Sequence, residues 1–154
     1  MVAAAIVRRA IDGLAVAVVL VALTGLVLGR ILPAIGHPVY IVAGPSMEAR
    51  IPIGAAVVLD RVAPTELRVG DVVSIQSGAQ QAVFTHRIVR IAGRADGLWI
   101  ETKGDANVDP DPSITSTADV IGRVGLSLPF AGYLIMLLSN TVGIELVLLA
   151  ISVI

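Results

Sequence analysis

The sequence predicts a mainly β fold, in which a small antiparallel β domain is flanked by an N-terminal and a C-terminal transmembrane helix. The chain has 154 residues, and 56% of them are hydrophobic while 15% are charged. Most charged residues lie between Ile31 and Arg123, so two apolar ends enclose a polar middle. That middle contains short β-branched segments separated by turn residues. This length allows one functional unit, a small domain with membrane segments.

The composition excludes several classes of function. A net charge of -1 offers no basic surface for a polyphosphate backbone, so we expect no nucleic-acid partner. The chain has no cysteine, which excludes disulfides, thiol nucleophiles and thiolate metal sites. Any catalysis must therefore use Ser, His, Lys or carboxylate side chains, and we expect no cofactor and no metal.

The first apolar segment is interpreted as a transmembrane helix over residues 10–32, preceded by a cytoplasmic N-terminus of residues 1–9. No charged residue occurs from Gly13 to Gly29. Two arginines precede this stretch and one follows it closely, which places the N-terminus in the cytoplasm and the middle section outside. A cleavable signal peptide is the alternative, but residues 28–33 contain no clean small-x-small cleavage site.

The second apolar segment, residues 127–154, is interpreted as a second transmembrane helix that begins near Phe130. A buried core helix is the alternative, but the middle section is too small to enclose it. Glu145 interrupts the segment and is costly at membrane depth, so we expect it near an interface or against another subunit. We therefore expect a multi-pass protein of the cell membrane, or of the endoplasmic reticulum membrane in a eukaryote.

The middle section, residues 33–126, is predicted to be an extracytoplasmic β domain. Its β-branched segments are bounded by Gly, Pro, Asp and Ser, as strands are. The predicted strands are residues 55–59, 71–75, 82–91, 98–102 and 120–124. Residues 76–81 and 93–97 have the composition of hairpin connections, which predicts an antiparallel meander.

Three clusters in this section carry residues suited to catalysis. Gly and Pro before Ser46 favour a tight turn that exposes its hydroxyl. His86 lies in a predicted strand and shares a face with Phe84, so its ring would be partly shielded from solvent. Residues 102–112 contain three aspartates that could orient a histidine, cap turns or bind calcium, although the calcium-hand glycine and glutamate are missing. Each cluster alone also fits an ordinary turn or a structural histidine.

Together, a serine, a histidine and an aspartate in this order, in a membrane-tethered β domain, supply a nucleophile, its base and an orienting acid. The chain resembles the type I signal peptidases, in particular the branch found in archaea, the endoplasmic reticulum and some Gram-positive bacteria. The resemblance covers most of the chain between the apolar ends. It rests on Gly44-Pro-Ser-Met47, Arg68-Val-Gly-Asp-Val-Val73, Thr85-His-Arg-Ile-Val89 and Thr102-Lys-Gly-Asp-Ala-Asn107.

The resemblance assigns the nucleophile to Ser46 and the general base to His86. It favours Asp111 as the orienting acid, with Asp105 expected to be more structural and Asp109 as the spare candidate; spacing alone does not separate the three. Two departures from the family pattern are a missing proline after Ser-Met-x, where Ala49 stands, and Ala55 after Gly54 in place of aspartate.

The resemblance implies a membrane-bound serine endopeptidase that removes N-terminal signal peptides from exported preproteins through an acyl-enzyme. It also implies small side chains before the cut. The expected partners are signal-peptide-bearing preproteins, the lipid bilayer and an accessory membrane subunit. Two alternatives remain open. One is a noncatalytic membrane-anchored β module that scaffolds an export or assembly complex, and the other is a self-cleaving Ser-Lys protease that uses Lys103, the sole lysine.

Overall fold

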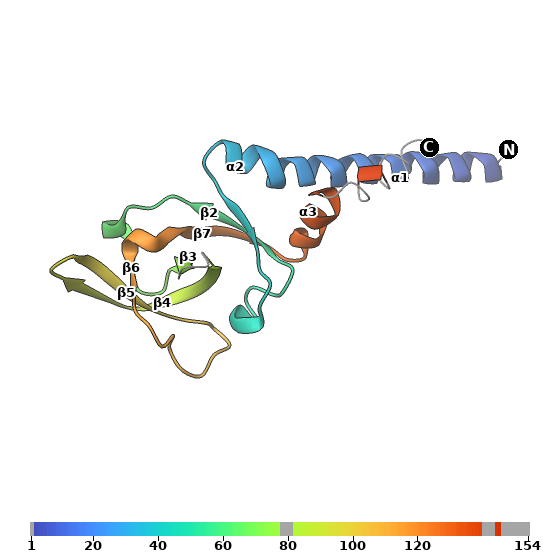
Figure 1. The fold of residues 1–154 in the computed structure, drawn as a ribbon. Coiled ribbons are helices and arrows are strands. Elements are labelled where there is room, and N and C mark those ends of the chain that lie inside the picture. The colour runs from blue at the N-terminus through green and yellow to red at the C-terminus, as the bar shows by residue number, and fades with distance from the viewer. Residues whose placement is uncertain (1, 78–81, 140–143, 146–154) are drawn as a thin grey trace.

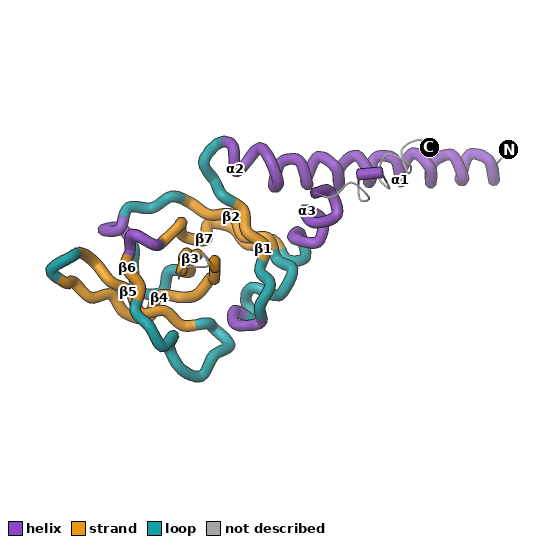
Figure 2. Tube along the Cα trace, viewed as in Figure 1, coloured by secondary structure: helices purple, strands orange, loops and turns teal. Residues whose placement is uncertain are grey.

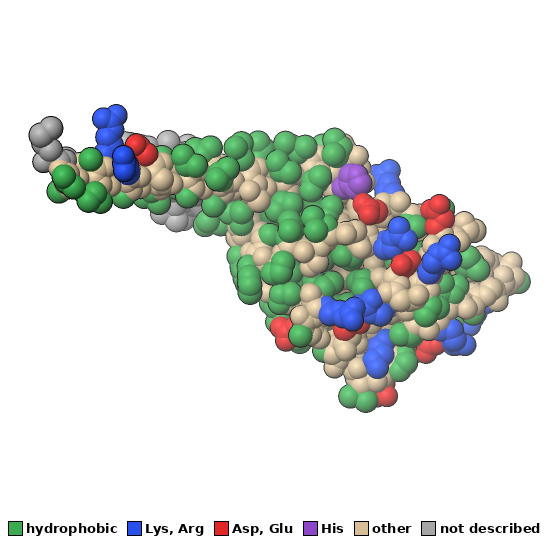
Figure 3. Space-filling model, turned by 180° about the vertical axis from the view of Figure 1, so that it is seen from behind, with side chains coloured by type: hydrophobic (Ala, Val, Ile, Leu, Met, Phe, Trp, Pro, Cys, Tyr) green, Lys and Arg blue, Asp and Glu red, His purple; other side chains and the backbone are tan. Residues whose placement is uncertain are grey.

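A computed structural model describes residues 2–77, 82–139 and 144–145 of the chain. It consists of a long N-terminal helix and a seven-stranded antiparallel sheet that curls into a small domain (Figure 1). The helix projects away from the strands, and a short helix, α3, lies beside it (Figure 2). Charged side chains gather over the strands, while the helix surface is hydrophobic along most of its length (Figure 3).

The N-terminal helix comprises α1 (Val2–Leu26), a π-helical turn (Val27–Ile31) and α2 (Leu32–Ala34). The π-helical turn ends two residues before Pro33, which has no N–H to donate to the preceding turn. Gly36 ends the helix with a φ of +96°, a conformation that favours glycine. Residues Ala5–Ala34 are long and apolar enough to cross a bilayer, and only 11% of their apolar window is buried against the rest of the protein.

The strand order in the sheet is β1-β2-β7-β3-β4-β5-β6. The strands are β1 (Val39–Ile41), β2 (Ala56–Asp60), β3 (Val72–Ser77), β4 (Ala82–Arg94), β5 (Gly97–Lys103), β6 (Thr115–Ser116) and β7 (Val120–Leu128). Three short 3-10 helices, Pro45–Met47, Pro64–Glu66 and Thr117–Asp119, connect them.

The five predicted strands correspond to β2, β3, β4, β5 and β7. The predicted meander is correct only from β3 to β6, because β7 returns to pair with both β2 and β3. The 93–97 hairpin is confirmed by the pairing of Arg94 with Gly97. Part of the 76–81 connection lies outside the described residues. Strands β1 and β6 are too short to produce a periodic signal.

Two clusters of buried apolar side chains form the core. The first contains Met47, Leu59 and Val57, and the second contains Ile75, Ile88 and further side chains from β3 and β5. Met47 follows directly after Ser46, and Ile88 lies two positions after His86 on the same face of β4. The core therefore fixes the segments that carry both candidate catalytic residues.

After β7, the chain enters α3 (Ala131–Ser139), which begins directly after Phe130. Gly25 of α1 lies against Leu138 of α3, and a Cβ atom at position 25 would overlap that leucine. After Ser139, the described part of the predicted second span consists of residues 144–145, which are helical; the remaining residues of this span lie outside the described residues. Within the part of the chain that the structure describes, the N-terminal helix alone is long enough to cross a membrane.

We predict that Val73→Ala lowers the free energy of unfolding by about 2–3 kcal/mol, because it leaves a cavity in the second core cluster. Val69→Ala is the matched control, since that valine is 62% exposed, and it should change stability by less than about 0.5 kcal/mol. Urea unfolding of the detergent-solubilised protein measures both. Equal effects of the two variants would contradict the assignment of the core.

Candidate active site

Ser46 is presented by the short 3-10 helix Pro45–Met47. Pro45 has a fixed φ that suits the first position of a helix. Met47 is completely buried in the first core cluster and anchors the turn. Its carbonyl accepts the backbone N–H groups of Arg50 and Ile51, at 3.1 and 3.0 Å. Ser46, between an exposed proline and a buried methionine, is left half-buried at the edge of the domain.

His86 connects Ser46 to Asp111. Its Nε2 lies 3.0 Å from Ser46 Oγ, and its Nδ1 lies 2.6 Å from Asp111 Oδ2. The side chains of His86 and Asp111 are only 12% and 14% exposed. With the proton on Nδ1, the neutral imidazole donates to the carboxylate and accepts the serine hydroxyl. This arrangement suits proton transfer from an alcohol to an imidazole.

Phe84 shields one side of the imidazole. Its ring meets the His86 ring edge-on, with centroids 5.1 Å apart. The two residues share a face of β4, as the period of a strand requires. Contact with an aromatic ring excludes water from that side of His86, so fewer solvent molecules compete for its hydrogen bonds.

Asp111 lies in the loop after β5 and is held at both its backbone and its side chain. Its backbone N–H donates to the carbonyl of Thr102 at 2.8 Å. The Thr102 hydroxyl donates to Asp111 Oδ2 at 2.6 Å. Sequence reasoning did not single out Thr102, although it belongs to the Thr102–Asn107 motif. A buried threonine at a strand end has no local signature that separates this role from packing.

The other two aspartates of the loop lie elsewhere. Asp105 forms a two-pronged pair with Arg87, whose Nε and Nη2 donate to its carboxylate at 2.8 and 2.6 Å. Arg87 also donates to the carbonyl of Gly70 at 2.7 Å, which joins the loop to the start of β3. Asp109 is exposed. The described structure therefore brings Ser46, His86 and Asp111 together and pairs Asp105 with an arginine.

The Arg87–Asp105 pair shifts the protonation of both groups. Hydrogen bonding by the guanidinium lowers the pKa of Asp105, an effect that burial opposes and that the charges of Arg87, Arg50 and His86 reinforce. The same hydrogen bond raises the pKa of Arg87. Both side chains are largely shielded, with 25% and 17% exposure. The pair therefore stays ionised and braces the loop that leads to Asp111.

Gly104 lets this loop pack against the Ser46 turn. A Cβ atom at position 104 would lie 2.6 Å from the carbonyl oxygen of Ser46 and 2.9 Å from Ser46 Cβ. Beside this contact, the N–H of Ala106 donates to the same carbonyl at 2.8 Å. Only glycine leaves room for an approach this close. The glycine of the Lys-Gly-Asp motif thus joins the turn of the serine to the loop of the acid.

A cavity of about 160 Å³ opens beside Ser46. Apolar side chains of β1 and β4 form much of its wall, and Gly44 and Thr85 complete it. The side chains that line it are Tyr40, Ile41, Val42, Ala43, Val83 and Phe84. A cavity of this size beside a nucleophile accommodates a small apolar group.

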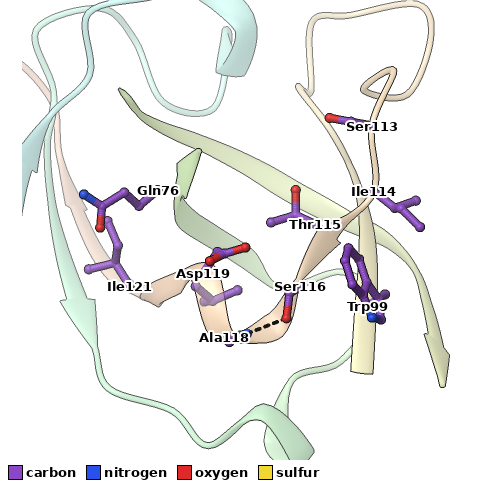
Figure 4. Close-up of a pocket in the computed structure, with 10 residues that line it drawn as sticks. Gln76, Trp99, Ser113, Ile114, Thr115, Ser116, Ala118, Asp119 and Ile121 are labelled. Carbon is purple, nitrogen blue, oxygen red and sulfur yellow. Dashed lines mark hydrogen bonds between the residues drawn. The ribbon is translucent and has the colours of Figure 1, made fainter. Parts of the chain in front are cut away.

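A larger cavity, of about 580 Å³, lies between β6, β7 and the 3-10 helix Thr117–Asp119 (Figure 4). Hydroxyl and amide groups of Gln76, Ser113, Thr115 and Ser116 line much of it. The hydroxyl of Ser116 accepts the N–H of Ala118 and thereby caps the short helix. The lining of this larger cavity does not include Ser46, His86 or Asp111, whereas Ser46 lines the smaller cavity. We therefore place the reactive site at the smaller cavity.

The chain is similar to fungal signal peptidase complex catalytic subunits. It is 32% identical over 120 residues to the Neurospora crassa protein, with 73% of this chain and 70% of the relative covered. The subunit of Fusarium vanettenii is 32% identical over 122 residues, 74% of this chain and 71% of the relative. The subunit of Sclerotinia sclerotiorum is 31% identical over 120 residues, which are 73% of this chain and 70% of the relative. No family model matches the chain.

We predict that the Arg87–Asp105 pair makes stability depend on pH in the acid range. Because the folded protein lowers the pKa of Asp105, its contribution is complete above the ordinary aspartate pKa of about 4 and is lost as the pH falls further. Asp105→Asn should therefore reduce stability at pH 7 and flatten its decline at lower pH. Urea unfolding across this pH range tests the prediction.

Asp109→Asn is the matched control, because Asp109 is an exposed aspartate of the same loop. It should leave both stability and its acid dependence close to those of the unchanged protein. An Asp105→Asn variant that follows the acid dependence of the unchanged protein would contradict the importance of the pair.

Proposed function

The chain belongs to the family of signal peptidase complex catalytic subunits, and on this premise we propose that it cleaves N-terminal signal peptides from exported preproteins. Ser46 is the nucleophile, His86 the general base and Asp111 the orienting acid. The observation that carries the proposal is the continuous path of hydrogen bonds from Asp111 through His86 to Ser46. It supplies the nucleophile, the base and the orienting acid of a serine peptidase.

In the acylation step, His86 Nε2 accepts the proton of Ser46 as the serine oxygen attacks the scissile carbonyl carbon. Asp111 keeps the other ring proton on Nδ1 and stabilises the imidazolium. The tetrahedral adduct collapses when His86 returns the proton to the leaving amine, which leaves an acyl-enzyme on Ser46. His86 then takes a proton from water, the hydroxide attacks the ester, and the serine regains its proton from the ring.

The negative charge on the tetrahedral oxygen requires donors from the main chain. Pro45 has no N–H and Gly44 has no hydroxyl, so we assign this role to the backbone N–H of Ser46 itself. A donor of this kind is worth about 3 kcal/mol in the transition state. Because the turn is anchored by Met47, the donor is already in place before the substrate binds.

The cavity beside Ser46 is the proposed pocket for the substrate side chain that precedes the cut. Its apolar wall favours an uncharged group, and the family resemblance implies a small one such as alanine. Strands β1 and β4 flank it, so an extended peptide can lie between them with its carbonyl at Ser46.

The membrane arrangement follows from the same substrate. A signal peptide has an apolar segment, and we propose that the N-terminal helix holds the β domain at the bilayer surface where the cleavage site emerges. We further propose that residues 127–154 form a second span and that Glu145 contacts another subunit. The relatives are subunits of a complex, which supports an accessory membrane partner and placement in the endoplasmic reticulum membrane or cell membrane.

The two alternatives receive less support. A noncatalytic scaffold does not need a serine, a histidine and a carboxylate in hydrogen-bond contact, and the relatives are named as catalytic subunits. A Ser-Lys protease needs its lysine at the serine. The Nζ of Lys103 donates instead to the carbonyl of Val108 at 2.8 Å.

We predict that Ser46→Ala and His86→Ala each lower cleavage of a preprotein by at least about 10³-fold, because each removes a reacting group. Asp111→Asn should lower it by roughly 10²- to 10⁴-fold through the wrong imidazole tautomer. Mass spectrometry of the products from purified protein and a preprotein measures the rate and the position of the cut.

Each variant has a matched control. Ser113→Ala, His37→Ala and Asp109→Asn make the same chemical changes outside the site and should retain cleavage within about threefold. Cleavage by Ser46→Ala at the wild-type rate, or none by the wild type, would refute the proposed activity. Loss of activity in Lys103→Ala with full activity in His86→Ala would favour the Ser-Lys alternative.

We also predict that Phe84→Ala broadens specificity, because it removes part of the pocket wall. Relative to a substrate with alanine before the cut, a substrate with leucine should gain about 10-fold or more in kcat/KM. The ratio of the two kcat/KM values is compared because loss of Phe84 also removes a contact of His86, which lowers cleavage of both substrates alike. Phe130→Ala, at an exposed phenylalanine away from the pocket, should leave the ratio unchanged. An unchanged ratio in Phe84→Ala would contradict the pocket assignment.

A further inference from the structure

We propose that Thr102 is a positioning residue of this site, whose hydroxyl holds the Asp111 carboxylate in the orientation that His86 requires. The inference rests on the proposed function and adds to it a fourth side chain that does not touch the substrate. Thr102 is 1% exposed and lies near the end of β5. The sheet therefore fixes the position of Thr102 independently of its contact with Asp111.

Strand pairing places Thr102 beside the histidine. Residue 102 of β5 pairs with Ile88 of β4, two positions from His86. Because side chains two positions apart lie on the same face of a strand, His86 and Ile88 share a face. The register of the two strands thus puts a hydroxyl next to the imidazole, on an element that the core holds rigidly.

Asp111, by contrast, belongs to an irregular loop and has no strand ladder to orient it. Two hydrogen bonds to Thr102 orient Asp111 in place of such a ladder. The carbonyl of Thr102 accepts the Asp111 N–H at 2.8 Å, which fixes the backbone, and its hydroxyl donates to Oδ2 at 2.6 Å, which fixes the side chain. Without the hydroxyl, the hydrogen bond to His86 Nδ1 is the one that remains to restrain the carboxylate among the described residues.

The chemistry of the contact fixes the direction of the hydrogen bond. An ionised carboxylate only accepts, so the Thr102 hydroxyl must donate its single proton to it. Thr102 Oγ1 and His86 Nδ1 both reach the same oxygen, Oδ2. Because Thr102 is buried, water has little access to replace its hydroxyl. Loss of the hydroxyl should therefore affect the geometry of the Asp111–His86 contact directly.

A purely structural role for this hydroxyl makes a different prediction, and the chain offers a matched control. Thr117 is also buried, at 6% exposure, and its hydroxyl donates to the carbonyl of Leu98 of β5 at 3.0 Å. Thr117→Val removes a buried hydroxyl that contacts the same strand without touching Asp111. If hydroxyl loss acts only through stability, Thr102→Val and Thr117→Val should have similar effects on catalysis.

The experiment measures kcat and KM for preprotein cleavage by the full-length protein in detergent, together with the thermal unfolding midpoint. Thr102→Val should lower kcat by roughly 10- to 100-fold with KM unchanged within about twofold, since a misplaced catalytic group affects mainly the chemical step. Thr102→Ser, which keeps the hydroxyl, should stay within about threefold of the wild-type kcat. Thr117→Val should leave kcat unchanged.

A second pair protects the test against misfolding of the valine variant. Thr102→Ser and Thr102→Ala differ only in the hydroxyl, and kcat of the serine variant should exceed that of the alanine variant by about 10-fold or more. Equal kcat values in this pair, or in Thr102→Val and the wild type, would overturn the inference. So would an equal loss of kcat in Thr117→Val.

Ser46→Ala in the same assay separates this inference from the proposed function. Inactive Ser46→Ala with fully active Thr102→Val would overturn the role of Thr102 alone. Equal cleavage by the wild type and Ser46→Ala would overturn the proposed function and, with it, the inference that depends on it.

Discussion

The hydrogen bonds on the two sides of the His86 ring join segments that are far apart in the sequence. Ser46 is 40 residues before His86, and Asp111 is 25 residues after it. An imidazole that contacts only one of these partners is an ordinary buried histidine. The site therefore depends on a fold that delivers a turn before β2, the middle of β4 and a loop after β5 to one point, within hydrogen-bond distance.

The sheet and one loop make this convergence possible. Pairing of β4 with β5 sets the position of Thr102 relative to His86, and the buried Met47 sets the position of Ser46. The loop after β5 then closes the arrangement through Gly104, which packs against the Ser46 turn, and through the Arg87–Asp105 pair. Arg87 is the immediate neighbour of His86, so one strand contributes both the base and the brace for the loop. The ion pair and close packing thus hold the loop, while two hydrogen bonds to Thr102 of β5 hold the acid itself.

The apolar N-terminal helix has a different physical basis. Its surface exposes valine and leucine side chains that a water-soluble domain would bury, and few of them pack against the strands. Such a surface is stable when lipid replaces water, which is consistent with attachment of the β domain to a bilayer. The C-terminal end of α3 packs against the same helix at Gly25, so α1 and α3 lie side by side.

The sequence alone determined the properties that depend on neighbouring residues. Short β-branched segments bounded by turn residues located β2, β3, β4, β5 and β7, and four short motifs indicated the family to which the comparisons assign the chain. The family resemblance favoured Asp111, but spacing left Asp105 and Asp109 open, since all three lie in one loop. Only the tertiary structure decided which aspartate meets His86, because Arg87 pairs with Asp105 and Thr102 holds Asp111. It also decided that β7 lies between β2 and β3. Both outcomes depend on contacts between distant segments, which local sequence patterns do not encode.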